Sequence, residues 1–549
     1  MSRALHYIFS FPFYTASSDN DGSFPYHEPG VVELLILLSF IFFLNVVRTV
    51  ADYYLYAGII AEIVLGMVYG DPLAGILPSD WEGTFTVLGY LGLIGIVFEG
   101  GLSTDLSLLV ANLPLSILCA CVGIALPVAF SFALLYAGYN YHPLEAFAAG
   151  AALCSTSLGT TLMALNSVTN SLASPDTDSN MVKVEKEQAR TVNGAVSAAV
   201  PPCIPLSDTP STLPPPPPPL QKSRIGTILI SAAVLDDVIG LVLSSLVPAL
   251  SSLSSATPHT RLAWTVVRPL LASALMAAIA PLVARFVLRP AFRFRRLGER
   301  WCAPRQAGRL WGSTRLLRLV SRPGSDIWGT QGHADAVGVT LMILLVSAFA
   351  AIAFYTGSSV LFGAYLAGLT VTYLQHPAKA RPSDDTPAPK LSFEATYART
   401  VGPLQQALLA PLFFASIGYG IPFLSLWRPK VLWRGVLYAL LMAAAKLAAG
   451  LPVVLWAMCS RTPNSSRASP IKESLCPALF IGVAMVARGE IGLLIAQIAR
   501  GAGDAPGLLG DEVFLVCIWA ILLCTLFSPI GVGYIVHRWQ HHIVHGIWA

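Results

Sequence analysis

The hydrophobic residues of this chain gather into long apolar runs that shorter polar segments separate. A run of about 20 apolar residues crosses the roughly 30 Å hydrocarbon core of a bilayer as a helix. The pattern therefore predicts an all-α polytopic membrane protein with about 13 transmembrane helices. The predicted spans are about 31–48, 54–70, 84–102, 108–138, 143–167, 225–253, 262–289, 334–356, 358–375, 403–422, 432–459, 475–499 and 512–537.

Two long polar segments interrupt this pattern. The first contains a six-proline run, Pro214–Pro219, which is typical of a disordered or polyproline II insert. Such an insert either binds a proline-recognising domain or is simply tolerated. The second is rich in arginine. The predicted organisation is an extracytosolic segment 1–30, helices 1–5 in 31–167, a cytosolic Pro-rich insert 168–224, helices 6–7 in 225–289, an Arg-rich cytosolic loop 290–333, helices 8–13 in 334–537 and a cytosolic tail 538–549.

Composition supports the membrane assignment, because 55% of residues are hydrophobic and 12% are charged. The net charge of +4 comes from arginines between the apolar runs, so membrane sidedness explains it better than nucleic-acid binding does. Sorting these charges places the N-terminus outside or in a lumen and the C-terminus in the cytosol. The plasma membrane is favoured, with a vacuolar or endosomal membrane as the alternative. The nine cysteines lack the paired spacing of zinc or disulfide sites.

Two adjacent carboxylates, Asp236 and Asp237, lie near the middle of the apolar run 225–253. An aspartate at the bilayer centre costs roughly 2.5 to 3.5 kcal/mol, so two unpaired charges cost about 5 to 7 kcal/mol. Helical rise places Asp236 about 17 Å below the start of its run. Neighbouring side chains of a helix point about 100° apart, so one partner cannot serve both carboxylates. We expect one to face a cation pathway and the other to face a basic side chain.

A single lysine, Lys446, lies about fourteen residues from either end of the predicted span 432–459. Its ammonium group is about 20 Å from each interface, which is too far for the side chain to reach water. A lysine at this depth needs an anion, and Asp236 or Asp237 is expected to supply it. Glu490 or carbonyl groups at a helix end are the alternative partners.

Two predicted spans have interrupted helical patterns. Arg488, Gly489 and Glu490 fall within the apolar run 478–495, and the stretch 151–161 is rich in hydroxyl groups and small residues. Paired broken helices in corresponding halves of a chain are typical of the central site of a transporter. Their half-helix dipoles, free carbonyls and Ser or Thr oxygens can bind a hard cation. Packing at helix contacts is the alternative interpretation of the hydroxyl groups.

Together these motifs resemble the monovalent cation:proton antiporter superfamily, specifically its second branch of bacterial-type Na⁺ or K⁺/H⁺ antiporters. The resemblance covers nearly all predicted spans. Its motifs are AAVLDDVIG at 232–240, RGEIGLLI at 488–495, the mid-span Lys446, FFASIG at 413–418 and AEIVLGMVYG at 61–70. The departures are the two long inserts and Glu99 in FEGG, which resembles the first, eukaryotic-exchanger branch.

The resemblance implies a thirteen-helix fold with two five-helix inverted repeats and two crossed broken helices, spans 5 and 12. Spans 4–6 and 11–13 would form a mobile core, and spans 1–3 and 8–10 a scaffold for homodimerisation. Asp237 would be the principal ligand of the transported Na⁺, and Asp236 the partner of Lys446. The remaining implied site residues are Thr156 and Ser157 beside the cation, with Arg488, Glu490, Glu62 and Glu99 in support.

The chemistry follows from the residues as well. Two carboxylates in one desolvated cavity titrate as a coupled set, so protons and sodium compete for the same oxygens. If only the protonated and cation-bound forms change between inward- and outward-facing states, the protein exchanges Na⁺ or Li⁺ for H⁺. We therefore expect a transporter that serves pH homeostasis, and not an enzyme. It needs no cofactor. A K⁺/H⁺ antiporter is the nearest alternative, followed by a Na⁺-coupled solute symporter and a cation channel. An intramembrane aspartyl protease is disfavoured, because its two aspartates would lie on separate helices.

Overall fold

The computed structural model describes residues 28, 30–55, 57–104, 112–157, 224–251, 259–290, 331–375, 392–459, 470–501 and 507–544. Within these ranges the regular structure is entirely helical, which confirms the predicted fold class. The helices are α2 Val31–Leu55, α3 Gly58–Tyr69, α4 Ser79–Ser103, α6 Leu113–Ser131, η1 Phe132–Gly138, α7 Pro143–Ala152, α10 Arg224–Ser251, α11 His259–Val283, η4 Ala284–Leu288, α14 Gln331–Thr356, α15 Val360–Gln375, α16 Phe393–Thr400, α17 Gly402–Leu404, η5 Gln405–Leu409, α18 Ala410–Tyr419, α19 Phe423–Leu426, α20 Pro429–Leu447, η6 Ala448–Gly450, α21 Leu451–Cys459, α22 Pro470–Ala484, α23 Glu490–Arg500 and α24 Asp511–Val544.

The number of membrane crossings stays a prediction. Among the described residues, eight helices are long and apolar enough to span a bilayer, or nine if the bent pair Phe393–Thr400 and Gly402–Tyr419 is one span. Several other predicted spans coincide with apolar helices too short for that criterion, such as α3 and α15. The predicted span 143–167 is helical only to Ala152, and its residues after Ser157 lie outside the described ranges. The structure therefore supports a polytopic protein without fixing the count at thirteen.

Several predicted segments fall largely outside the described ranges. These are the N-terminal segment 1–30, the Pro-rich insert 168–224 and the Arg-rich loop 290–333, so their organisation stays a prediction. In the last predicted segment, 538–549, helical structure continues to Val544 past a kink at Trp539, and the assignment of this segment as a cytosolic tail stays a prediction.

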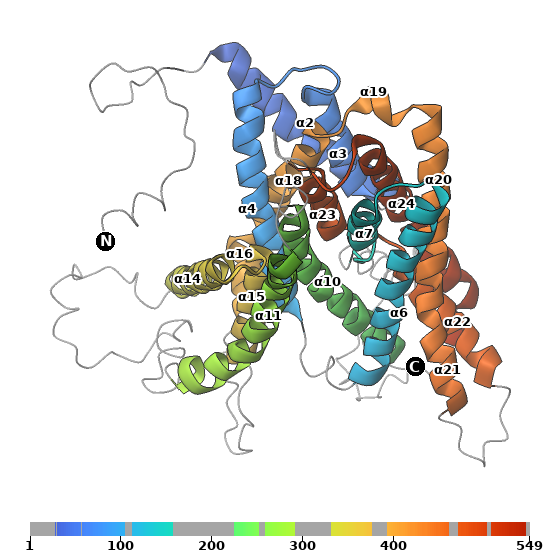
Figure 1. Ribbon diagram of the computed structural model, residues 1–549. Coiled ribbons are helices and arrows are strands. Elements are labelled where there is room, and N and C mark those ends of the chain that lie inside the picture. The colour runs from blue at the N-terminus through green and yellow to red at the C-terminus, as the bar shows by residue number, and fades with distance from the viewer. Residues whose placement is uncertain are drawn as a thin grey trace, which may run out of the picture. The chain divides into compact units, whose positions relative to one another are not determined.

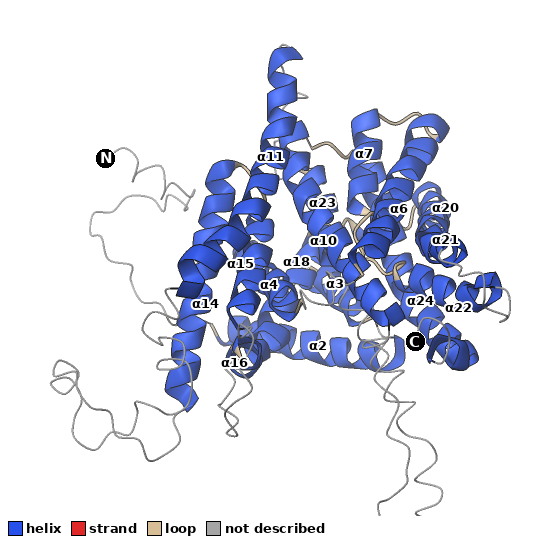
Figure 2. Cartoon of the chain, turned by 90° about the horizontal axis from the view of Figure 1, so that it is seen from below, coloured by secondary structure: helices blue, strands red, loops and turns tan. Residues whose placement is uncertain are grey.

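The chain divides into two compact units, Met1–Phe42 and Phe43–Ala549, with the boundary inside α2. Within the second unit the helices pack as two groups (Figures 1 and 2). One group contains α3, α4, α14, α15, α16 and α18, and the other contains α6, α7 and α20 to α24. Helix α10 contacts members of both groups. Apart from α10, which the resemblance assigns to the core, the two groups have the membership of the implied scaffold and core, whose roles in movement and dimerisation stay predictions.

Glycines in α4 let this helix approach its neighbours closely. A Cβ atom on Gly89 would lie 2.7 Å from the Cα atom of Phe413 in α18, and one on Gly101 would collide with the carbonyl oxygen of Tyr365 in α15. Contacts this short need residues without side chains, as is usual where membrane helices cross. Helix α4 therefore packs tightly against both α15 and α18.

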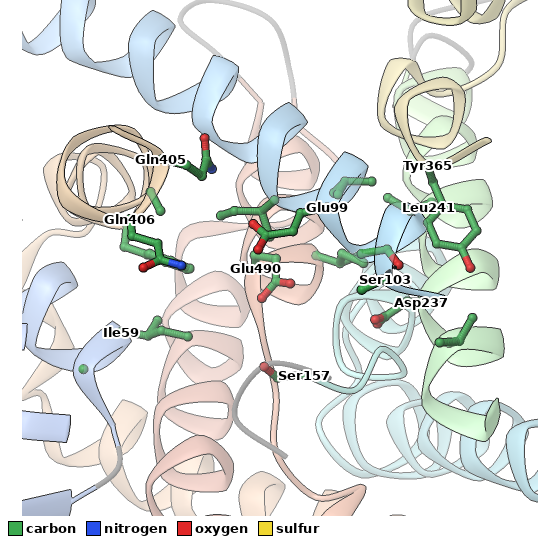
Figure 3. A pocket seen from close by; sticks show the side chains of 18 of the residues that line it. Ile59, Glu99, Ser103, Ser157, Asp237, Leu241, Tyr365, Gln405, Gln406 and Glu490 are labelled. Carbon is green, nitrogen blue, oxygen red and sulfur yellow. Dashed lines mark hydrogen bonds between the residues drawn. The ribbon is translucent and has the colours of Figure 1, made fainter. Parts of the chain in front are cut away.

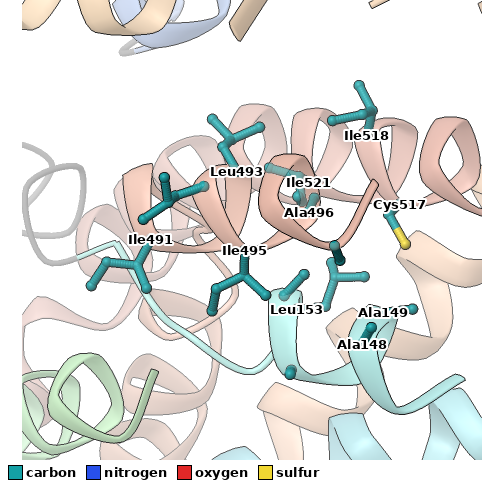
Figure 4. Packing of buried hydrophobic residues seen from close by; sticks show 14 of the residues in the cluster. Ala148, Ala149, Leu153, Ile491, Leu493, Ile495, Ala496, Cys517, Ile518 and Ile521 are labelled. Carbon is teal, nitrogen blue, oxygen red and sulfur yellow. The ribbon is translucent and has the colours of Figure 1, made fainter. Parts of the chain in front are cut away.

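In the other group, small residues of α7 pack against two helices from the end of the chain (Figure 4). Ala148 and Ala149 are fully buried, and they lie in the same cluster as Ile495 of α23 and Cys517 of α24. Alanine side chains bring the backbones close, which holds the two interrupted helices in contact.

Candidate functional site

Two interrupted helices cross next to α10. Helix α7 ends at Ala152, and helix α22 ends at Ala484 before α23 begins at Glu490. The backbone N–H of Ser157 donates to the carbonyl of Ala487 at 3.0 Å. The Arg488 guanidinium donates through Nη1 to the carbonyl of Ser155, also at 3.0 Å. The breaks predicted at 151–161 and 488–490 thus lie against each other and satisfy each other's free backbone groups.

Gly489 allows the two breaks to meet. It is the N-cap of α23 and has an extended backbone, with φ −131° and ψ −159°. A Cβ atom at this position would lie 2.8 Å from the Cβ atom of Ser157. Because real Cβ atoms do not approach so closely, any other residue at position 489 would push the breaks apart.

Asp236 and Lys446 form an ion pair beside this crossing, and both side chains are fully buried. Thr156 completes the group, because its hydroxyl donates to Asp236 Oδ2 at 2.8 Å and accepts from Lys446 Nζ at 2.9 Å. The contact predicted between Lys446 and one of the two aspartates is therefore present, and Asp236 is the partner. Removing one member of such a pair leaves a buried charge and costs about 3 to 5 kcal/mol.

Asp237 lies on a different side of α10 and is partly exposed. The hydroxyl of Ser155 donates to its Oδ1 atom at 3.1 Å. Sequence reasoning proposed Thr156 or Ser157 as the cation neighbours and omitted Ser155 from the site. Ser155 bonds to Asp237 and Ser157 lines the same cavity as Asp237, whereas Thr156 bonds to Asp236. The direction of the backbone at the break decides this assignment, and the sequence does not show that direction.

A cavity of about 370 Å³ opens beside Asp237 (Figure 3). At about 30 Å³ per molecule, this volume holds on the order of ten waters. The carboxylates of Asp52, Glu99, Asp237 and Glu490 line it, together with the hydroxyl of Ser157. The other polar lining residues are Arg48, Ser103, Tyr365, Gln405 and Gln406. A hydrated cation that enters the cavity therefore meets several acidic and neutral oxygens before it reaches Asp237.

Glu62 takes a different position from the other supporting residues. Its fully buried carboxylate binds Arg48, with 3.1 Å between Oε1 and Nη1. Arg48 Nη1 also donates to the carbonyl of Gln406 at 3.2 Å. The Nε atom of Arg48 lies 3.7 Å from Asp52 Oδ2. Arg48 and Asp52 line the cavity, whereas Glu62 lies behind Arg48 and outside the lining.

The far end of α23 meets the end of α18. Arg500 donates through Nη1 to the carbonyl of Gly420, and Gln497 donates to the carbonyl of Ile417 at 3.1 Å. The first residues of both helices, in contrast, line the cavity. Ten helical steps of 1.5 Å separate Glu490 from Arg500, a distance of about 15 Å. The two groups of helices therefore separate around the cavity and touch at the other end of α23.

A family model described as "Sodium/hydrogen exchanger, transmembrane" matches residues 35–174 and 314–538, which is more than half of the chain. The chain belongs to the sodium/hydrogen exchanger family. The resemblance to cation:proton antiporters is thereby confirmed. This match includes Thr156, Lys446, Arg488 and Glu490, whereas Asp236 and Asp237 fall between its two ranges. The assignment of the aspartate pair to the exchanger site therefore rests on the geometry described above.

Two curated relatives of this chain are named as bacterial antiporters. The Na(+)/H(+)-K(+) antiporter GerN of Bacillus cereus is 23% identical over 191 residues, or 35% of this chain and 40% of that protein. The Na(+)/H(+) antiporter of Enterococcus hirae is 24% identical over 206 residues, or 38% of this chain and 44% of that protein. The chain thus spans less than half of the length of either relative. Membership of a family of membrane transporters agrees with the many apolar helices.

Proposed function

We propose that the protein exchanges Na⁺ or Li⁺ for protons across a membrane by alternating access. The observation that carries the proposal is the different surroundings of the two adjacent aspartates. The fully buried side chain of Asp236 pairs with Lys446, whereas Asp237 faces a cavity that three further carboxylates line, those of Asp52, Glu99 and Glu490. The ammonium group of Lys446 neutralises Asp236, so Asp237 is available to bind a transported cation.

In this proposal protons and sodium compete for Asp237. A hard cation prefers oxygen ligands, which Asp237, Ser155 and Ser157 provide. Protonation of the carboxylate removes its negative charge and so displaces the cation. If only the occupied forms change sides, inward movement of one ion drives outward movement of the other.

Alternating access accounts for the asymmetry around α23. The cavity reaches Asp237 from one end of this helix, and contacts of Arg500 and Gln497 join the two groups of helices at the other end. We infer that movement of the core group along the scaffold breaks these two contacts and opens a second path to Asp237. Two hydrogen bonds to carbonyls at the end of α18 are few enough to be exchanged for bonds to water.

Potassium is the second candidate cation, because one relative is named a Na(+)/H(+)-K(+) antiporter. We further propose that the exchanger is a homodimer, that it serves pH homeostasis at the plasma membrane or a vacuolar or endosomal membrane, and that its C-terminus is cytosolic. The positions of the arginines between apolar runs support this orientation.

Proteoliposomes that carry a pH gradient test the proposal. Addition of sodium or lithium is expected to collapse the gradient with native protein and not with the Asp237→Asn variant. Asp80→Asn is the matched control, because Asp80 is exposed in the first turn of α4. Collapse by potassium alone would keep the mechanism and change the substrate. An Asp237→Asn variant as active as native protein, or cation flux without proton movement, would overturn the proposal in favour of a channel or a symporter.

A further inference from the structure

The break between α22 and α23 leaves carbonyl groups that no continuing helix satisfies. Within a membrane such groups need a partner from the protein itself. Helix α24 packs against both α22 and α23, and two of its hydroxyl groups reach the break. Thr525 donates to the carbonyl of Arg488 at 2.7 Å, and Ser528 donates to the carbonyl of Val483 at 2.8 Å. Both side chains are almost completely buried.

The two hydroxyl groups differ in whether the carbonyl that accepts their hydrogen bond has another donor. Val483 already accepts a hydrogen bond from the N–H of Val486 at 3.1 Å, so Ser528 adds a second bond to a satisfied carbonyl. Arg488 lies before the first turn of α23, where Gly489 accepts the first helical bond from Leu493. The bond from Thr525 therefore holds the peptide group after Arg488, while the bond from Ser157 to the Ala487 carbonyl holds the peptide group before it.

From Arg488 a line of hydrogen bonds leads to the cation ligand. Its guanidinium donates to the carbonyl of Ser155 at 3.0 Å, and the Ser155 hydroxyl donates to Asp237 at 3.1 Å. We propose that Thr525 is a positioning residue for cation exchange, which acts on Asp237 through Arg488 and Ser155. This inference rests on the proposed function of Asp237.

The chemistry of Ser155 explains why its position matters. This residue carries two oxygens that could bind a hard cation, the carbonyl and the hydroxyl. Arg488 occupies the carbonyl, so the hydroxyl is left to face Asp237. When a cation arrives, rotation about one side-chain bond turns the hydroxyl proton away and presents the oxygen. Without Thr525 the Arg488 backbone moves, and the hydroxyl loses its alignment with Asp237.

The test measures the sodium dependence of proton exchange in proteoliposomes. Thr525→Val keeps the shape and removes the hydroxyl, and one hydrogen bond corresponds to a roughly three- to tenfold effect. We expect the sodium KM to rise by this factor with the maximal rate within about twofold of native. Thr525→Ser should restore the native KM. Ser528→Ala, which removes the neighbouring hydroxyl of the same helix, should leave the KM unchanged.

A double-mutant cycle with Ser155→Ala separates positioning from general packing. Residues in one line of hydrogen bonds have effects that do not multiply, so the KM of Thr525→Val/Ser155→Ala should be close to that of Ser155→Ala alone. Thr525→Ala takes the place of Thr525→Val in this cycle if the valine variant does not fold. Multiplying effects, a native KM in Thr525→Val, or equal losses in Ser528→Ala would overturn the inference while native exchange stands. Native protein without cation-dependent proton exchange would overturn the proposed function and this inference with it.

Discussion

Replacement of Lys446 by methionine tests the buried ion pair. Methionine has a similar length and shape, so the variant removes the charge with little change in packing. It leaves the Asp236 carboxylate fully buried with the Thr156 hydroxyl as its remaining described hydrogen-bond donor. Breaking such a pair costs about 3 to 5 kcal/mol, whereas replacing both charges by neutral groups of similar size is often neutral.

The matched variants are Asp236→Asn and the double variant Asp236→Asn/Lys446→Met. We expect Lys446→Met to lower the unfolding temperature of purified protein in detergent strongly, and the double variant to recover most of the loss. The assay is thermal unfolding followed by tryptophan fluorescence, with each variant at the same pH and detergent concentration. If Lys446→Met unfolds at the native temperature, or if the losses of Asp236→Asn and Lys446→Met simply add in the double variant, the two side chains are not a buried pair and the reasoning fails.

Three further predictions concern the crossing, the cavity and the pH profile. Gly489→Ala should lower the exchange rate about tenfold or more, because its Cβ atom would meet Ser157 at 2.8 Å, whereas Gly83→Ala, which has no atom within 4 Å, should be native. Glu99→Gln should raise the sodium KM at low ionic strength and less so in high salt, because it removes one charge from the cavity. Burial raises the pKa of Tyr141, in the loop before α7, to about 12, so this hydroxyl stays protonated at neutral pH and Tyr141→Phe should leave the pH dependence of exchange unchanged.

The buried pair was predictable from sequence because charges deep in apolar runs have few partners. Depth along the helix was enough to match Lys446 with Asp236 or Asp237, although it could not choose between them. The two breaks were likewise indicated by glycines and polar residues inside apolar runs. Ser155 was missed because its role depends on the backbone direction after α7 ends.

Thr525 was missed for a different reason. A threonine inside an apolar helix usually bonds to its own helix, and Thr525 does lie 2.8 Å from the carbonyl of Ile521. Its second contact, with Arg488, needs the packing of α24 against the break. Glu62 was grouped with the site from its motif, yet the structure pairs it with Arg48, which lies fourteen positions earlier on another helix. Short helices such as α3 explain why the number of spans could not be confirmed by length.

Proton release on cation binding tests the central claim most directly. Purified protein in weakly buffered detergent solution is mixed with sodium chloride while a pH indicator follows the solution. We predict that native protein and Asp80→Asn release protons in proportion to protein concentration, and that Asp237→Asn releases far fewer. Equal release from the native protein and Asp237→Asn, or none from native protein that is folded, would contradict the claim that protons and cations compete for Asp237.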